Sequence, residues 1–336
     1  MRLKATIGDV ATLAGVSPAT ADRVLNERGG VKPDKERRVL AAARQLKFGR
    51  QIRRAYAHRL RVAVAIQSAE NPFHAELSRA FAAVNRDVAD LNLQFLVHHL
   101  DPNQTDRIPG LIDRLAQQHD GLVVASPAGP EIAAAMRRAA ATIPVATLAT
   151  DVPESGRHAY VGPDDLQGGS VAGDLMGRFI GPSGGDILMI AGLLSMTGHR
   201  ARESGFRRVL DAHFPACRVV AVEESGERAE QAGIVTAAAL HRYPGLRGIY
   251  LTSAGADAVA AVLRRAGRSD IVFITHELTA DRRALLRRRE IHAVVDQDPS
   301  GEVRAVADIM ARLLGRAEGD PNGVVTPVRI YTAENC

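Results

Sequence analysis

Residues 6–27 read TIGDVATLAGVSPATADRVLNE, and they determine how the rest of the chain is interpreted. Apolar residues recur at helical intervals in two short segments, so that each segment has one apolar face. Gly15 lies between the segments, where its permissive backbone suits a tight bend. Ser17 offers an N-cap to the second segment, and Pro18 is tolerated in the first turn because it lacks an N–H group. The stretch therefore predicts a helix-turn-helix.

The charge distribution indicates what such a head would bind. Residues 1–61 contain 15 Lys and Arg against 5 Asp and Glu, a net charge of +10, whereas the other 275 residues contain 28 against 33, a net charge of −5. Taken in isolation, residues 6–27 could also be a simple αα-hairpin without nucleic-acid function. A strongly basic head on a weakly acidic body favours a polyanion as partner, because neutralised phosphates release counterions. A third helix, at about residues 33–47, is expected to complete the core of the head.

In a helix-turn-helix, the N-terminal residues of the second helix face the base edges of the major groove. The candidates for reading bases are Pro18, Ala19 and Arg23. Arg23 can donate hydrogen bonds from its side chain, and Ala19 can contact a thymine methyl. The candidates for phosphate contacts, which set the register, are Thr6, Ser17, Thr20 and Asn26. Asp22 is expected either to accept from a cytosine amino group or to pair with a neighbouring arginine.

The spacing I-x-D-V-A-x-x-A-G-V-S-x-x-T-x-x-R-V-L-N over residues 7–26 resembles the head of lactose-repressor-type (LacI family) transcription regulators. The order of segments downstream agrees with this resemblance over essentially the whole chain. It implies a homodimer that binds double-stranded operator DNA through two heads, under the control of a small molecule bound in the body. The expected fold is an all-α helix-turn-helix head followed by an α/β two-lobed body with parallel sheets, similar to a type I periplasmic binding protein.

The expected boundaries are residues 1–48 for the DNA-binding domain, 49–61 for a basic linker and 62–336 for the effector-binding body. In the resembling family, a short linker helix inserts into the minor groove. Ile52, Tyr56 and Leu60 recur every four residues here and are the candidates for such a wedge. A solvated linker that only contacts phosphates is the alternative, and the sequence leaves both open.

The body alternates short apolar runs with amphipathic helical stretches, which is typical of parallel sheets covered on both faces. Strands are expected at residues 62–66, 93–97, 121–125, 145–148, 187–190, 219–222, 248–251, 271–274 and 293–295. Helices are expected at about 74–90, 129–141, 165–180, 199–213, 227–242, 255–266, 279–289 and 300–315, before an extended run at 324–330. The first lobe is expected at about 62–163 and 296–318, and the second at about 164–295 and 319–336. The resemblance implies that the chain crosses between the lobes three times.

Open parallel sheets bind ligands beyond the carboxyl ends of their strands, so the loops there are the candidate ligand site. The residues expected to bind the ligand are Asn71, Phe73, His74, Ser126, Asp151, Arg202, Ser253, Glu277 and Gln297. Asn71 and Pro72 could instead form only a turn and a helix cap. His199 and Arg200 stand near Arg202, as support for the site or as solvated surface.

The resemblance assigns roles to part of this set. It makes Arg202 the ligand arginine at a helix start and Gln297 a contact from the segment between the lobes. Glu277 takes the place of an acidic anchor, and His276 replaces the family's aromatic residue. The family's asparagine after residue 251 is missing, and Ser253 is its expected substitute.

Polar groups of both signs favour a small polyhydroxylated effector, a sugar or a sugar alcohol, that relieves repression. A purine or amino-acid-like effector, or a co-repressor, is the alternative. No cofactor, metal site or catalytic activity is expected, because no metal-ligand or phosphate-loop motif is present. Two cysteines and an N-terminus without a secretory signal predict a cytoplasmic protein, in contrast to an exported solute-binding protein without DNA function. No apolar run is long enough for a membrane span.

Overall fold

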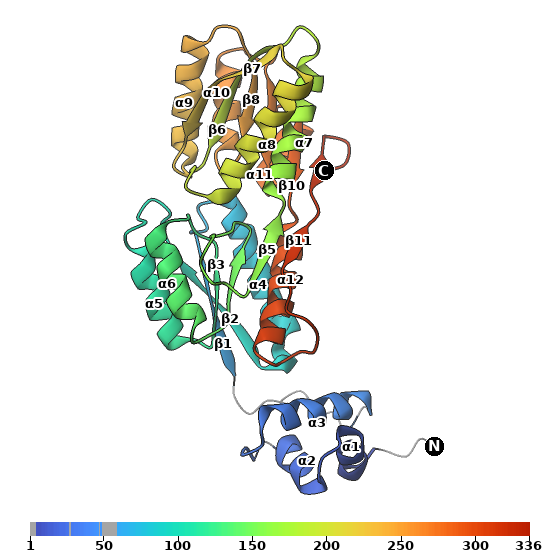
Figure 1. Ribbon diagram of the computed structural model, residues 1–336. Coiled ribbons are helices and arrows are strands. Elements are labelled where there is room, and N and C mark those ends of the chain that lie inside the picture. Colours follow the sequence, from blue (N-terminus) through green and yellow to red (C-terminus); the bar gives the residue numbers. More distant parts are fainter. Residues whose placement is uncertain (1–4, 27, 47, 49–58) are drawn as a thin grey trace.

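The computed structural model describes residues 5–26, 28–46, 48 and 59–336. A small helical head and a two-lobed α/β body follow one another along the chain (Figure 1). Ile52 and Tyr56, two of the candidate wedge residues, lie outside the described residues. No helix among the described ranges has the length and apolar character needed to cross a membrane.

The head consists of α1 (Ile7–Ala14), α2 (Pro18–Leu25) and α3 (Pro33–Gln45). Thr6 and Asp9 form a reciprocal capping box that fixes the start of α1. Gly15 ends α1 in the left-handed region, at φ 61°, and Ser17 caps α2 by accepting from the backbone N–H of Thr20. The inner faces of the three helices share one small core, which includes Val10, Ala21, Val24, Val39 and Leu40. The predicted helix-turn-helix and its third helix are therefore confirmed.

The body contains two six-stranded sheets. The first has the order β11-β5-β4-β3-β1-β2. Its strands are β1 (Leu60–Ile66), β2 (Leu93–His99), β3 (Gly121–Val124), β4 (Val145–Leu148), β5 (Ala159–Pro163) and β11 (Val324–Thr326). The second has the order β12-β10-β9-β8-β6-β7. Its strands are β6 (Gly185–Ala191), β7 (Cys217–Glu224), β8 (Leu246–Leu251), β9 (Val272–His276), β10 (Ala293–Asp296) and β12 (Arg329–Tyr331). The neighbouring strands pair in parallel except β12, which is antiparallel to β10.

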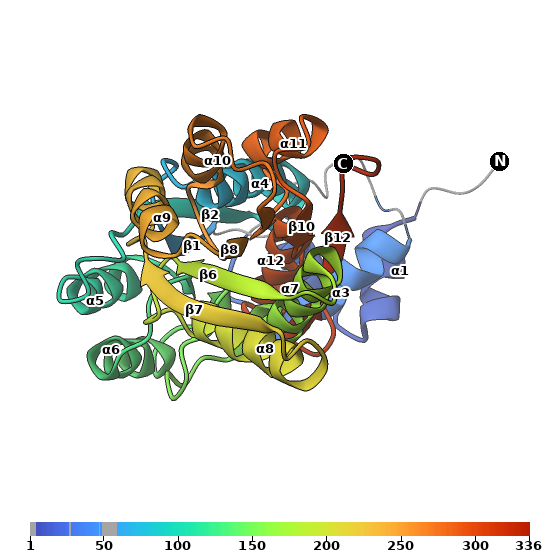
Figure 2. The ribbon, with the colours of Figure 1, turned by 90° about the horizontal axis from the view of Figure 1, so that it is seen from above.

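Helices cover both faces of each sheet, which explains the continuous apolar runs of the inner strands. In the first lobe, α4 (Pro72–Asp87), which continues into η2 (Ala89–Leu91), and α12 (Pro299–Leu313) pack on one face, and α5 (Ile108–Gln118) and α6 (Pro130–Ala140) pack on the other. In the second lobe, α7 (Asp165–Ile180) and α8 (Thr197–His213) pack opposite α9 (Ala229–Arg242), α10 (Ala256–Arg265) and α11 (Ala280–Arg287). Figure 2 shows from above how these helices cover the two faces of the second sheet.

Glycines allow α7 and α8 to pack backbone against backbone. A Cβ atom added at Gly169 would lie 2.0 Å from the carbonyl oxygen of Arg202, and one added at Gly205 would lie 2.0 Å from that of Leu166. Only glycine fits at such close approach. This contact fixes the position of Arg202 on α8 relative to the start of α7.

The chain crosses between the lobes three times, after β5, after β10 and between β11 and β12. The expectation that residues 319–336 belong wholly to the second lobe is wrong, because β11 pairs with β5 at the edge of the first sheet. The single extended run expected at 324–330 is also two strands. Pro327 and Val328 separate them, and the two strands belong to different sheets.

Leu60 is not a linker residue. Its backbone N–H donates to Asn92 at 2.9 Å, and it pairs with Leu93 as the first residue of β1. The proposed role of Leu60 as a wedge is therefore wrong, because its backbone is held in the first sheet. The helix α5 has no counterpart among the predicted helices.

Candidate functional site

A cavity lies between the two lobes, with about 40 Å³ available to the centres of water-sized molecules. Its lining comes from the ends of the parallel strands and the helix starts that follow them: Gln67, Asn71, Phe73, His74, Ala125, Ala149, Thr150, Met196, Gly198, His199, Arg202, Glu227, Ser253, Glu277 and Gln297. Both lobes and the second crossing segment therefore contribute to one cavity.

Seven of the nine residues expected to bind the ligand line this cavity, namely Asn71, Phe73, His74, Arg202, Ser253, Glu277 and Gln297. Ser126 and Asp151 do not. The Ser126 hydroxyl is fully buried and donates to the carbonyl oxygen of Pro127. Asp151 accepts from Thr147 at 2.8 Å and forms a bidentate ion pair with Arg157, so its oxygens are already occupied within the first lobe.

Arg202, on α8, is the most extensively bonded side chain of the cavity, and it is 4% exposed. Its Nε donates to Asp165 at 2.7 Å, and one terminal nitrogen donates to the carbonyl oxygen of Thr252 at 2.9 Å and to Glu277 at 3.1 Å. The other terminal nitrogen donates to Gln297 at 3.1 Å. The guanidinium thus joins α7, the loop after β8, the loop after β9 and the second crossing.

A second buried arginine supports Glu277 from behind. Arg282, on α11, is 1% exposed, and its terminal nitrogen lies 3.9 Å from Glu277. Arg282 also donates to Thr279 at 2.8 Å and to the carbonyl oxygen of Ser253 at 2.6 Å. These bonds hold the two loops that carry Ser253 and Glu277 at fixed positions on the wall of the cavity.

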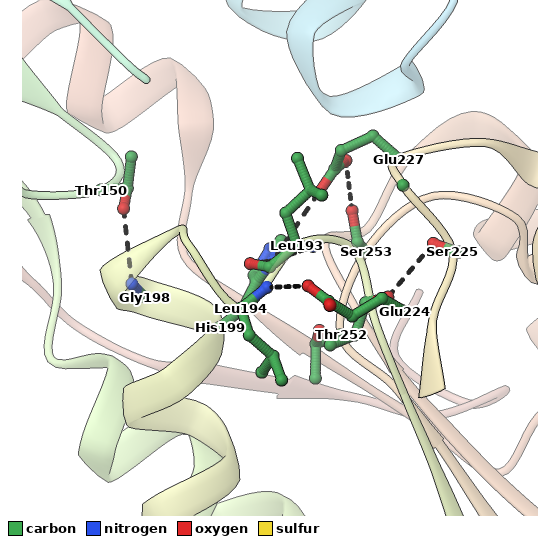
Figure 3. A network of polar contacts seen from close by, with 12 residues as sticks. Thr150, Leu193, Leu194, Gly198, His199, Glu224, Ser225, Glu227, Thr252 and Ser253 are labelled. Carbon is green, nitrogen blue, oxygen red and sulfur yellow. Dashed lines mark hydrogen bonds and ion pairs between the residues drawn. The ribbon is translucent and has the colours of Figure 1, made fainter. Parts of the chain in front are cut away.

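Glu227 is the principal cavity residue that the sequence analysis missed. It lies in the loop after β7, where its Oε2 accepts from Asn71 of the first lobe at 2.7 Å. The same oxygen accepts from Ser253 at 2.5 Å (Figure 3). Burial raises the pKa of Glu227 to about 7. Ligands of open parallel sheets bind beyond the carboxyl ends of the strands, and Glu227 lies in such a loop. The sequence analysis placed Glu227 at the start of a helix expected at 227–242, whereas α9 begins at Ala229.

Two histidines of the cavity are neutral at physiological pH. Burial lowers the pKa of His74 and that of His199 to about 3. The backbone N–H of Leu193 donates to Nδ1 of His199 at 3.1 Å, while Nδ1 of His74 has no hydrogen-bond partner within the described part of the chain. His276 lies behind the wall, where its Nε2 meets the Tyr250 hydroxyl at 2.6 Å. The histidines therefore add hydrogen-bonding groups to the site and no positive charge.

Direct hydrogen bonds join the lobes around the cavity. Asn103 donates to the carbonyl oxygen of Gly226 at 3.0 Å, and the backbone N–H of Ala128 donates to the carbonyl oxygen of Ser195 at 2.9 Å. The backbone N–H of Gly198 reaches the Thr150 hydroxyl at 3.4 Å (Figure 3). The lobes are thus closed upon each other.

Three residues of the wall adopt the left-handed conformation without being glycine. They are Ala149 at φ 60°, Glu227 at φ 62° and Glu277 at φ 58°. Such backbone strain costs free energy and is concentrated at functional sites, where the surrounding structure holds it in place. Its presence in loops from both lobes supports the cavity as the functional site of the body.

In the head, the candidate base-reading residues Pro18, Ala19 and Arg23 are exposed along α2. Thr6, Ser17 and Asn26 are also exposed, and Thr20 is half-buried. Asp22 accepts from Asn26 at 2.6 Å and pairs with Arg28 at 3.1 Å. Of the two roles expected for this carboxylate, the structure shows the pairing with a neighbouring arginine. Across the described residues of the whole chain, no group of three or more His, Cys, Asp or Glu is placed to hold a metal ion.

Comparison with known proteins matches both parts of the chain. Residues 62–318 match the periplasmic binding protein domain family, and residues 6–51 match the bacterial regulatory proteins of the lacI family. The HTH-type transcriptional regulator DegA of Bacillus subtilis is 26% identical over 216 residues, which are 62% of this chain and 61% of DegA. The sucrose operon repressor of Klebsiella pneumoniae is 33% identical over 131 residues, 37% of this chain and 38% of the repressor.

Solved structures share the fold of the body. A solute binding protein of an ABC transporter from Burkholderia graminis, in complex with D-arabinose, superposes with a TM-score of 0.76 at 24% identity, over 83% of this chain and 97% of that one. GanP, a glucose-galactose binding protein from Geobacillus stearothermophilus, superposes with a TM-score of 0.74 at 21% identity, over 82% and 98%. The chain therefore consists of a helix-turn-helix head that matches the lacI family of bacterial regulatory proteins and a body that belongs to the periplasmic binding protein domain family.

Proposed function

We propose that the chain is a cytoplasmic, non-enzymatic transcription regulator that acts as a homodimer. Its two heads bind double-stranded operator DNA, and a small sugar or sugar alcohol in the inter-lobe cavity changes the affinity for that DNA and relieves repression. The observation that carries the proposal is the convergence of Asn71, Arg202 and Gln297, from the two lobes and the segment between them, on one cavity. The relatives named above are regulators and solute-binding proteins.

The mechanism is a coupling of two binding events. A ligand held between Asn71 in the first lobe and Arg202 in the second stabilises one angle between the lobes. In a dimer, that angle sets the separation of the two heads, and half-site spacing on DNA tolerates little change in this separation. The ligand therefore changes DNA affinity, and DNA changes ligand affinity by the same factor. Dimerisation is part of the proposal because one small head makes few base contacts.

The test begins with selection of bound duplexes from a randomised pool, using the full chain. The selected duplex is then titrated with the protein in the presence of a panel of pentoses, hexoses and sugar alcohols. We expect a pseudo-palindromic site, and at least one compound that weakens binding. Retention of no duplex even at low salt would overturn the DNA-binding proposal. Unchanged affinity across the whole panel would overturn the sugar switch while leaving DNA binding intact.

A further inference from the structure

The charged side chains that line the cavity are unbalanced. Among the described residues of the lining, they are one arginine, Arg202, and two carboxylates, Glu227 and Glu277. His74 and His199 are neutral there, since burial lowers their pKa values to about 3. Above the pKa of Glu227, which burial raises to about 7, two carboxylates in this lining therefore stand against one cationic group.

The single cationic side chain of the lining is largely occupied. Hydrogen bonds to Asp165, Thr252, Glu277 and Gln297 use four of the five N–H donors of Arg202, which leaves one donor for a ligand. Asp165 and Glu277 also balance its charge from two sides. An anionic ligand at this donor would lie beside these buried carboxylates. Burial of like charges without compensation is costly.

Glu227 differs from the other carboxylates of the site because one of its oxygens is unused. Its side chain is 5% exposed, and Oε2 accepts from Asn71 and Ser253. Oε1 has no hydrogen-bond partner in the part of the chain that the structure describes. It is packed against Gly192, where an added Cβ atom would lie 1.8 Å from it, and Nδ1 of the neutral His199 lies 3.7 Å away. Glu227 therefore lines the cavity as a buried carboxylate without a cationic partner among the described residues.

We propose that Glu227 is the residue that selects the effector by charge: its carboxylate, which has no cationic partner among the described residues, attracts an ammonium group of the ligand and repels an anionic one. The cavity accordingly takes neutral and amine-bearing polyols and rejects sugar acids and sugar phosphates. This inference rests on the proposed function, because it specifies the ligand class of the same cavity. It assigns a role to a residue outside the set that the sequence analysis selected.

The test compares matched sugars that differ at a single substituent, which changes their charge. Glucose, galactose and mannose are each measured beside their 2-amino and uronic acid counterparts, by calorimetry and thermal shift on the full chain. We expect at least one amine-bearing or neutral sugar to bind and raise Tm, and its uronic acid counterpart to bind about tenfold or more weakly. Binding of a uronic acid as tightly as its neutral counterpart would overturn the inference and leave the sugar-sensing function standing. Absence of binding by all members would count against both.

Glu227→Gln keeps the size of the side chain and removes its charge. We expect the ratio of amine-bearing to neutral affinity to fall about tenfold in this variant, because a negative charge near the ammonium group of the ligand is lost. Glu230→Gln, an exposed carboxylate on α9, is the matched control and should leave the ratio unchanged. Glu227→Asp, which retains the charge, should keep the preference for amines. A ratio in Glu227→Gln equal to that of the unmodified chain overturns the proposal, and the Tm of each unliganded variant verifies that it folds.

Discussion

The guanidinium of Arg202 and the carboxylate of Asp165 lie 2.7 Å apart across the contact of α8 with α7. Both side chains are buried, and a Cβ atom added at Gly198 would lie 2.5 Å from Asp165. The glycines of this contact therefore allow the carboxylate to reach the arginine. The orientation of the principal cation of the cavity is set by the packing of two helices before any ligand enters.

A substitution at this helix contact should act on both stability and ligand binding. Gly169→Ala places a Cβ atom about 2.0 Å from the carbonyl oxygen of Arg202, so α7 and α8 must move apart. We expect the free energy of unfolding to fall by about 1–3 kcal/mol, the usual cost of overpacking. Denaturant unfolding measures this change. Gly110→Ala in α5 is the control, since its Cβ would meet only Arg114 at 3.5 Å, and it should be neutral or slightly stabilising.

Removal of Arg202 should destabilise the second lobe as well as abolish the effector response. Arg202→Ala leaves the buried carboxylate of Asp165 without its cation and leaves Glu277 only Arg282, 3.9 Å away, and breaking a buried pair costs about 3–5 kcal/mol. Urea unfolding of Arg202→Ala should show this loss, whereas Arg208→Ala, an exposed arginine on α8, should stay within about 0.5 kcal/mol of the unmodified chain. A loss in Arg202→Ala as small as that of Arg208→Ala would mean that the network is not held by the arginine.

The sequence predicts the alternation of strands and helices because parallel strands buried on both faces leave apolar runs that are separated by amphipathic helices. It does not predict α5, since Pro109 and Gly110 at its start are typical of a turn. The edge position of β11 depends on tertiary pairing with β5, which no local pattern encodes. The positions of the strand ends predict where the cavity lies. They do not predict that Asp151 is excluded from ligand binding, because this depends on its ion pair with Arg157, six residues later in the chain.

The stability of the chain should depend on pH through Glu227. Burial raises the pKa of this group from 4.5 to about 7, so the folded state holds a proton that the unfolded state has released in this interval. The free energy of unfolding should be unaffected below pH 4.5 and should fall as pH rises towards 7, by about 3 kcal/mol in total. Urea unfolding of the full chain and of Glu227→Gln at several pH values isolates this contribution. If the difference between the two proteins is constant from pH 4.5 to 8, Glu227 does not titrate in this range.

The last prediction concerns the head, where Arg23 is exposed on α2 and Arg28 is paired with Asp22. If Arg23 reads a base, Arg23→Ala should weaken binding to the selected operator by about 1–3 kcal/mol and relax the preference at one base pair in each half-site. If Arg23 contacts a phosphate instead, Arg23→Ala should weaken binding to all duplexes equally. The slope of log affinity against log salt concentration should then fall by about one. Titrations on the selected duplex and on its single-base variants, at two salt concentrations, separate these outcomes. Arg178→Ala, which removes an exposed charge from α7 in the body, should change neither property.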